Sequence, residues 1–481
     1  MLKLLVATLS ALLLATPAMG GEADRPNIIW ITIDDVGPDF ACYGNGLVKT
    51  PSLDALAERG QRFERCFVTT PVCSAVRSAL ITGSYATTIG AHQHRSKRPL
   101  PEGYAPITEH LGRAGYRCTA LPVRRVKHGR FLEERTAGTS PEKILSITGR
   151  LKLDFNFNRG QDADMFTAWD PEAEGPFFAM IDFNPQKGPA RWAREVAAGL
   201  DAKVNPDDVT IHPYWPDTPE MRDRVALYNE AVSVLDAEIG EVFAWLDRQD
   251  LADDTVVFVW GDHGQAAFRH KQWCYDSGLR VPLIVAGPGV TPARRSELVS
   301  SIDLAATTLR LAGVVAPVWM EGRDFLGAGA EARTHIFASR DRCDESEDRV
   351  RAVRSERFKL IHNFHPELPY IDQNDYTRRA FLEVPQLLAM RATGELSDTQ
   401  ALWCGPTKAE WEFFDLETDP LELQNIYGDS AHADDIEALR KSLEVWVART
   451  DANNPFPEEM ATIIPNKAHR QVSEARAAER D

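Results

Sequence analysis

Short apolar runs alternate with amphipathic stretches over the first two thirds of the chain. The run Asn27–Ile33 (NIIWITI) is almost continuously apolar and predicts a strand buried on both faces. Pro51–Arg59 predicts a helix with Pro in its first turn, and Pro219–Arg248 predicts a long helix capped by Thr218. Further strands are predicted at residues 115–121, 176–183, 255–260 and 280–286. This alternation favours an α/β fold with a large, mostly parallel sheet covered by helices on both faces.

The pattern changes after about residue 330. Shorter strands are predicted at residues 334–339, 351–364 and 411–416, followed by a helix at residues 434–449. We interpret residues 21–330 as the main α/β domain and residues 331–465 as a smaller C-terminal α+β subdomain that carries an antiparallel sheet. Residues 466–481 are interpreted as a polar tail.

The N-terminus is typical of a secretory signal peptide. Lys3 precedes an apolar run at residues 4–15, and the small residues Ala18 and Gly20 follow. The run is short for a bilayer span, which takes about 20 residues, and no other run is long enough. We expect residues 1–20 to be removed and the protein to be exported to the periplasm or secreted, without a membrane span after cleavage. A buried N-terminal helix is the alternative.

The net charge of −17 argues against a nucleic acid partner, because binding to phosphates needs clustered Lys and Arg. It is compatible with a small anionic substrate, since a few cations in one pocket outweigh a distant acidic surface. The seven cysteines are an odd number, so an exported protein would leave at least one thiol unpaired or modified. Their spacing matches no zinc pattern, and disulfides among the other six remain an open alternative.

Candidate chemistry gathers at or soon after the C-terminal ends of predicted strands, the edge where open α/β sheets place their sites. Asp34-Asp35 follow the first strand, Asp262-His263-Gly264 follow another, and Lys271 comes nine residues after Asp262. If a helix begins at Cys73 and ends at Gly83, Cys73 and Arg77 share one face, and its N-terminus suits an anion. Taken singly, these residues are as well explained as a buried thiol, turn carboxylates and solvated cations.

Taken together, the four clusters resemble the sulfatase family. Its signature, C-x-[P/A]-x-R followed by an apolar pair and T-G, fits residues 73–83 throughout. Residues 87–96 (TTIGAHQHRS), 270–278 (HKQWCYDSG) and 350–361 (VRAVRSERFKLI) are similar to bacterial heparan N-sulfatase-like enzymes. The resemblance implies an alkaline phosphatase-like fold, with residues 21–330 as the catalytic domain. It also implies oxidation of the signature cysteine to formylglycine by a formylglycine-generating enzyme.

The resemblance further implies roles for the site residues. A Ca²⁺ ion would be held by the carboxylates of Asp34, Asp35 and Asp262. The modified nucleophile at Cys73 and the side chain of His263 would complete its ligands. Arg77 and Lys271 would neutralise the sulfate. The formylglycine hydrate would attack sulfur with one hydroxyl, and loss of the proton of the other would expel sulfate. An oxygen-rich ligand set favours calcium over zinc.

The chain departs from the family pattern at two proton-handling or sulfate-binding positions. The K-x-D-F-N-F string at residues 152–157 suggests Lys152 as the sulfate-binding lysine, with Lys127 and His128 as the alternative. Where relatives carry a histidine after the strand at residues 176–183, this chain reads N-P-Q-K-G, so Lys187 is the candidate contact. Three histidines could reach the pocket mouth, although each is more often structural: His92, His94 and His212.

Three hypotheses about function follow. The leading one is hydrolysis of a sulfate ester or sulfamate on a sulfated small molecule or oligosaccharide such as a glycosaminoglycan fragment. The second is that the protein is a phosphodiesterase or phosphonate monoester hydrolase of the alkaline phosphatase superfamily, which includes the sulfatases. The third, motivated by the missing histidine, is a non-catalytic protein that binds sulfated glycans.

Overall fold

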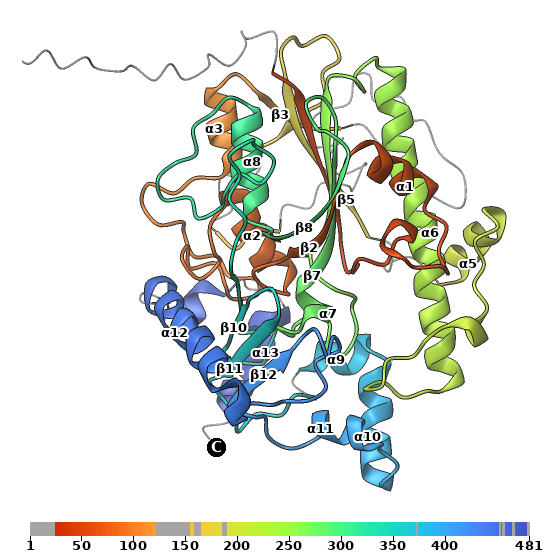
Figure 1. Cartoon of the computed structure of the whole chain (residues 1–481), viewed down its shortest axis with the longest axis vertical. Helices are drawn as coiled ribbons and strands as arrows, with labels where there is room; N and C mark the ends of the chain where they lie inside the picture. Colours follow the sequence, from red (N-terminus) through yellow and green to blue (C-terminus); the bar gives the residue numbers. More distant parts are fainter. Residues whose placement is uncertain are drawn as a thin grey trace, which may run out of the picture.

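Two β-sheets organise the chain in the computed structural model (Figure 1). The structure describes residues 25–121, 154–157, 165–184, 190–371, 374–451, 454, 457–463 and 467–478. The larger sheet has eight strands in the order β4-β3-β5-β1-β6-β7-β2-β8, and the smaller has four in the order β12-β11-β10-β9. The strands of the larger sheet are β1 (Asn27–Ile33), β2 (Gln61–Phe67), β3 (Arg117–Ala120), β4 (Thr167–Ala168), β5 (Phe177–Phe183), β6 (Thr255–Gly261), β7 (Arg280–Ala286) and β8 (Ala293–Ser300).

The larger sheet is mostly parallel, as predicted. β1 pairs in parallel with β5 and β6, and β3 pairs in parallel with β4 and β5. β7 is antiparallel to both of its neighbours, β6 and β2, whereas β2 and β8 are parallel. Among the described strands, β7 alone therefore runs against the others. The carboxyl ends of β5, β1 and β6 consequently meet at one edge, where the candidate residues follow them.

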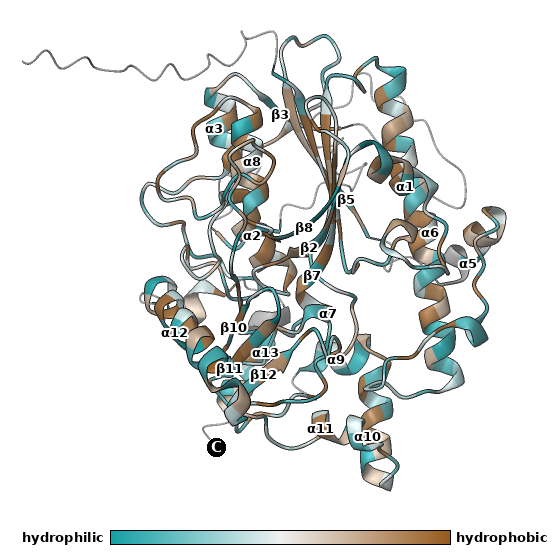
Figure 2. Ribbon diagram, in the orientation of Figure 1, coloured by the Kyte–Doolittle hydropathy of each residue, from teal (hydrophilic) through white to brown (hydrophobic). Residues whose placement is uncertain are grey.

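Helices cover both faces of this sheet because alternate side chains of each strand point to opposite sides. Ile29 and Ile31 of β1 pack in a core shared with α1 (Pro51–Arg59) and α6 (Pro219–Arg248), which also contacts α5 (Ala190–Gly199). Ile28 and Trp30 pack on the other side with α2 (Cys73–Thr82), α3 (Ile107–Arg113) and α8 (Asp303–Leu311). Figure 2 shows the resulting apolar sheet between helices that are hydrophilic outside. Thr218 caps α6, as expected, by accepting a hydrogen bond from Met221 N.

The smaller sheet is antiparallel, as predicted, and is covered on one face by α12 (Ala433–Thr450). Its strands are β9 (Ile336–Arg340), β10 (Val350–Arg354), β11 (Phe358–Asn363) and β12 (Trp411–Asp415). Further helices are α7 (Asp276–Leu279), α9 (Asp375–Ala380), α10 (Glu383–Thr393), α11 (Asp398–Trp403) and α13 (Lys467–Ala478). Short 3-10 helices lie at Ala41–Tyr43, Pro206–Asp208, Ser430–His432 and Met460–Thr462.

Some expectations about elements were wrong. Residues 351–364 form a hairpin, β10 and β11, because the polar segment at residues 355–357 turns the chain back. β2 and β8 were missed, since their sequences QRFERCF and ARRSELVS carry many charged residues. Most of the segment interpreted as a polar tail is helix α13, in which Val472 is buried.

Two further expectations concern cysteines and membranes. All seven cysteines lie in the described part of the chain, and no two of them are joined by a disulfide. None of the helices in the described ranges has both the length and the apolar character needed to cross a bilayer. The expected signal peptide, residues 1–20, lies outside the described residues.

Candidate active site

The candidate nucleophile begins a helix that is buried along its whole length. α2 starts at Cys73, and Gly83 ends it in the left-handed conformation with φ of 66°, which confirms the predicted helix bounds. Cys73 is 8% exposed and Arg77, one turn later, is 1% exposed. The amide groups of the first turn have no partner within the helix, so its N-terminus presents positive potential beside Cys73.

Two strand ends bring carboxylates and a histidine to the same place. Ile33 of β1 lies beside Gly261 of β6, so the residues that follow each strand are neighbours. Asp35 N donates to Asp262 Oδ1 at 3.0 Å, and Asp262 N donates to Ile33 O at 3.0 Å. Asp35 has a left-handed backbone, with φ of 60°, a conformation that Asp tolerates better than most residues. This turn directs Asp34 and Asp35 into the site.

His263 links this edge to the thiol. Its Nε2 lies 3.0 Å from Cys73 Sγ, and its Nδ1 lies 2.9 Å from Gly264 O and 3.7 Å from Asp35 Oδ1. Burial lowers the pKa of His263, but the negative charges of Asp262 and Cys73 outweigh it and raise the pKa to about 9. The imidazole therefore sits in an environment that attracts positive charge.

Arg77 is held by three carboxylates. Its Nη2 bonds to Asp34 and lies 3.3 Å from Asp262 Oδ2, and its Nη1 bonds to Asp182. Burial lowers the pKa of Arg77, but Asp182, Asp34 and Asp262 raise it well above its ordinary value. The guanidinium is therefore a fixed cation whose planar fork is oriented by its partners.

Lys271 reaches the site from the loop that follows β6. Its Nζ donates to Asp35 Oδ1 at 2.7 Å, and the side chain is 9% exposed. Burial lowers the pKa of Lys271, but Asp35 and Cys73 raise it well above the ordinary value. The lysine is therefore a charged hydrogen-bond donor at neutral pH.

Sequence reasoning missed two polar residues at the end of β5. Asp182 lies beside Thr32 of β1 and bonds to Arg77, and Asn184 Nδ2 donates to Asp34 Oδ2 at 2.7 Å. One signal was available: Asp182 is the charged residue of an otherwise apolar, wholly buried strand, FFAMIDF. Such a carboxylate needs a buried cation as its partner.

The assembled site is rich in carboxylates. Besides Cys73 and His263, six ionisable side chains meet here within the described part of the chain, all of them buried: Asp34, Asp35, Asp182, Asp262, Arg77 and Lys271. The raised pKa of His263 keeps its imidazole protonated at neutral pH, so three cationic side chains face the four carboxylates. Carboxylates that lie close together repel one another, and a divalent cation between them would offset this repulsion. Ligand atoms of Asp35, Cys73 and His263 lie within 4.8 Å of one another and can hold a metal ion. One of these three donors is a carboxylate oxygen, and Asp262, whose Oδ1 accepts from Asp35 N and lies 3.6 Å from His263 Nε2, adds another beside them. Carboxylate oxygens suit a hard cation.

The other histidine candidates are anchored in buried surroundings. Burial lowers the pKa values of His92 and His94, and His94 Nδ1 lies 3.5 Å from Asp344 Oδ1. The next residue of this loop touches the start of α2, because Arg95 N donates to Ser74 Oγ at 3.0 Å. His212 stacks on Tyr214, and burial lowers its pKa to about 4. The lysine and histidine candidates Lys127, His128, Lys152 and Lys187 lie outside the described residues.

A family comparison identifies the chemistry of this arrangement. The sulfatase family model matches residues 26–314, more than half of the chain. The chain belongs to the sulfatase family. A second model, the C-terminal region of N-sulphoglucosamine sulphohydrolase, matches residues 261–376 of this sulfatase. The chain is therefore an enzyme of the sulfuric ester hydrolase class, as the sequence predicted.

Individual relatives cover most of this sulfatase. It is 31% identical over 473 residues to an ulvan-active sulfatase of Formosa agariphila. This alignment covers 90% of this chain and 77% of that protein. It is 26% identical over 457 residues to N-sulphoglucosamine sulphohydrolase of Homo sapiens, covering 88% and 90% of the two chains. A solved structure in complex with its substrate D-glucosamine-2-N,6-O-disulfate has a TM-score of 0.61 and 17% identity, covering 90% of this chain and all of that one. The predicted alkaline phosphatase-like fold is confirmed.

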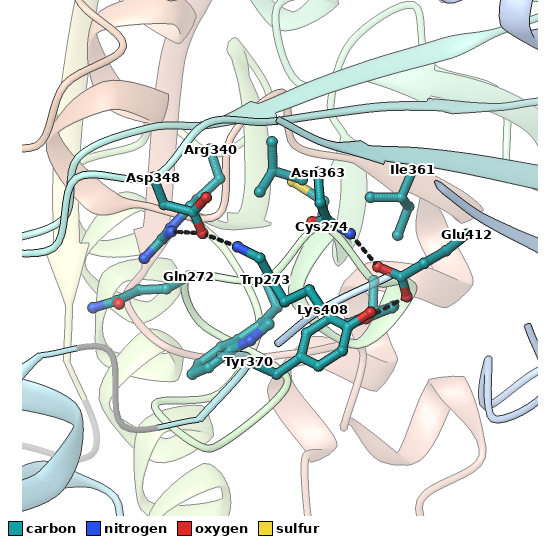
Figure 3. A pocket seen from close by; sticks show the side chains of 12 residues that line it. Gln272, Trp273, Cys274, Arg340, Asp348, Ile361, Asn363, Tyr370, Lys408 and Glu412 are labelled. Atoms are coloured by element: carbon teal, nitrogen blue, oxygen red, sulfur yellow. Dashed lines mark hydrogen bonds and ion pairs between the residues drawn. The ribbon is translucent and has the colours of Figure 1, made fainter. Parts of the chain in front are cut away.

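A small cavity lies between the loop that carries Lys271 and the smaller sheet of the sulfatase (Figure 3). On one side, Asp348 Oδ2 accepts from Arg340 Nη1 and Lys408 Nζ, both at 2.5 Å. On the other, Glu412 accepts from Asn363 at 2.6 Å and from Tyr275 at 2.7 Å. The cavity leaves about 20 Å³ for the centre of a water molecule, which is room for water and too little for a sugar ring. The cavity is therefore a small space, lined by ion pairs and hydrogen bonds, behind the loop that carries Lys271.

Proposed function

We propose that this sulfatase removes sulfate from a sulfated carbohydrate, as an ester or a sulfamate, with position 73 as the nucleophile after its conversion to formylglycine. The observation that carries the proposal is the placement of Cys73 at a helix N-terminus, opposite a buried cluster of carboxylates that also holds Arg77, Lys271 and His263. The carbohydrate class is supported by relatives named for activity on ulvan and on N-sulphoglucosamine.

The buried carboxylates support a calcium ion at the strand ends. Asp34, Asp35 and Asp262 would hold it, together with His263 and residue 73, since calcium prefers oxygen ligands and accepts irregular geometry. When bound, the ion and the formylglycine hydrate supply Lewis acidity, a hydroxyl nucleophile and a route for release of sulfate. Asn184, which donates to Asp34 Oδ2, would hold that carboxylate in place.

The two cations would act on the sulfate itself. Arg77 is locked between carboxylates, so it can orient residue 73 and offset charge on the sulfate without moving. Lys271 keeps its proton, because Asp35 and Cys73 raise its pKa, so it can donate a hydrogen bond to a sulfate oxygen. Lys271 is therefore assigned to charge stabilisation and not to proton abstraction.

Lys152 is proposed as a further sulfate-binding residue. The segment that follows it packs on the nucleophile helix, because Asn156 N donates to Ser78 Oγ at 2.7 Å. Asn156 Nδ2 also donates to Ala91 O at 2.8 Å and to Gln93 O at 2.6 Å. This anchoring supports Lys152 over its alternatives, Lys127 and His128. Lys187, His92 and His94 are kept as proposed contacts of the substrate.

The test is sulfate release by protein coexpressed with a formylglycine-generating enzyme. Heparan-derived and ulvan-derived sulfated oligosaccharides serve as substrates, with an aryl sulfate and an aryl phosphodiester for comparison. Tryptic mass spectrometry of the Cys73 peptide measures conversion, and Cys73→Ala is the matched inactive control. The proposal expects release from at least one saccharide. A fully converted, calcium-loaded protein that cleaves only the phosphodiester would contradict it.

A further inference from the structure

The loop that carries Lys271 has a left-handed backbone on both sides of the lysine. Arg269 has φ of 66° and Gln272 has φ of 77°, and neither residue type favours this region. A residue with a Cβ adopts such a conformation at a cost, and keeps it only where its surroundings fix it. The contacts of these two residues therefore determine the shape of the loop.

The first position is fixed by the buried guanidinium group of Arg269. Its Cζ lies 3.9 to 4.5 Å from the centroids of three aromatic rings, those of Tyr214, Tyr275 and Trp403. Its Nη1 donates at 3.0 Å and its Nη2 at 2.9 Å to two carbonyl oxygens that follow β12, at Leu421 and Glu422. The start of the loop is therefore tied to the C-terminal subdomain.

The second position is fixed by hydrogen bonds to two different elements. Gln272 is 4% exposed, and its N donates at 2.9 Å to the carbonyl oxygen of Pro71, two residues before Cys73. Its Oε1 accepts from Asn374 Nδ2 at 2.9 Å. Asn374 is itself fully buried and caps α9, because its Oδ1 accepts from Thr377 N at 2.9 Å. Gln272 therefore joins the chain that enters the nucleophile helix to the C-terminal subdomain.

The backbone of Gln272 affects where the lysine lies. Lys271 Nζ donates to Asp35 Oδ1 at 2.7 Å. A change of residue 272 to negative φ would rotate the peptide group between it and Lys271, and would move the stem of the lysine. Because a four-carbon stem is flexible, the bond to Asp35 alone leaves the direction of the other N–H groups open.

We propose that Gln272 is a positioning residue, whose hydrogen bond to Asn374 keeps the loop in the left-handed conformation that directs the Lys271 ammonium group toward the sulfate. The inference rests on the proposed function, in which Lys271 contacts the sulfate. It gives the C-terminal subdomain a part in catalysis through one buried amide pair. Because every substrate carries the sulfate group, the effect of Gln272 is independent of the leaving group.

The test compares Gln272→Ala with Gln272→Gly, which remove the same hydrogen bond and differ in their backbone preference. Alanine is disfavoured at positive φ, whereas glycine adopts this conformation freely. On an aryl sulfate and on a sulfated disaccharide, we expect kcat to fall about 10-fold in Gln272→Ala and only about threefold in Gln272→Gly. KM should stay within about twofold, because Lys271 keeps its charge. A side chain that only filled space would give no advantage to glycine, which fills less.

Asn374→Ser is the second variant, because serine also caps helices and is too short to reach Gln272. Its kcat should fall as in Gln272→Ala. Asp250→Ala is the matched control: Asp250 has φ of 55° in an exposed turn before β6, at the sheet edge opposite the site. We expect its kinetics to equal those of wild type. Each kcat is expressed per mole of converted position 73, at a temperature at which thermal unfolding shows that the variant is folded.

Three results would overturn the inference. They are a wild-type kcat in Gln272→Ala, a wild-type kcat in Asn374→Ser, and a kcat of Gln272→Gly no higher than that of Gln272→Ala. A wild type that is converted at position 73 and supplied with calcium, yet releases no sulfate, would instead overturn the proposed function.

Discussion

Replacing Asp182 by Asn should weaken calcium binding although Asp182 is not among the proposed ligands. Asp182 bonds to Nη1 of Arg77, while Nη2 of the same guanidinium bonds to Asp34. Asn preserves the size of the side chain and an acceptor oxygen, and removes one negative charge from the buried cluster. Arg77 would then compete more strongly with the ion for Asp34 and Asp262.

The magnitude follows from Coulomb's law. A divalent ion about 8 Å from a unit charge interacts by about 2 kcal/mol at an effective dielectric of about 40, and by about 4 kcal/mol at about 20. The lower figure corresponds to a roughly 30-fold weaker affinity, since about 1.4 kcal/mol is tenfold. We therefore expect the dissociation constant for calcium to rise at least about 30-fold in Asp182→Asn.

The assay is thermal unfolding as calcium is titrated, because a ligand that binds the folded state raises the unfolding temperature as its concentration passes the dissociation constant. Asp303→Asn is the control: Asp303 is a buried carboxylate paired with Arg333 at 2.7 Å at the start of α8. That variant should lose stability and keep the calcium midpoint of wild type. A midpoint for Asp182→Asn within about threefold of wild type would refute the charge argument.

Three other predictions address the turn behind the site, acid stability and export. A Cβ at Gly264 would lie 1.9 Å from a backbone oxygen, so Gly264→Ala should destabilise the fold by about 1–3 kcal/mol or more, measured by denaturant unfolding. Gly46→Ala, where a Cβ meets nothing within 4 Å, is its control, and equal stability of the two variants would contradict the clash. Burial raises the pKa of Asp276, but Lys359 and Arg354 together outweigh it and the pKa falls to about 2. Because this is below the ordinary 3.8, the stabilisation is present above about pH 4 and lost toward pH 2, so the unfolding temperature should fall more steeply there in wild type than in Asp276→Asn. N-terminal sequencing of protein exported from a bacterial host should begin near Gly21, and an intact N-terminus on exported protein would disprove cleavage.

The periodicity of apolar residues was sufficient to predict the elements whose pattern of burial is regular. The bounds of β1, α1 and α6 follow from their apolar spacing and from Pro at the helix starts. β8 has an exposed, arginine-rich first half because it lies at the sheet edge, so no apolar run marked it. Its pairing with β2 is set by tertiary contacts, which local sequence does not contain.

The site residues divide in the same way, into those that the sequence alone predicts and those that require knowledge of the fold. Asp34, Asp35, Asp262 and His263 could be grouped from sequence because parallel strands end at a common edge, whichever helices cover them. Asp182 needed knowledge that β5 lies directly beside β1, since three other strands intervene in the sequence. The contact between Gln272, which follows Lys271, and Asn374 could not be anticipated, because 102 positions separate the two residues in the sequence.

The burial of α2 has a consequence for the timing of maturation. Every residue of this helix is buried, and the thiol at its start lies beneath the ends of β1 and β6. In the finished fold, a modifying enzyme would find Cys73 buried at the start of a buried helix. If Cys73 is converted to formylglycine as proposed, its oxidation would compete with closure of the sheet in a newly made chain, and a molecule that folded first would keep an unmodified thiol.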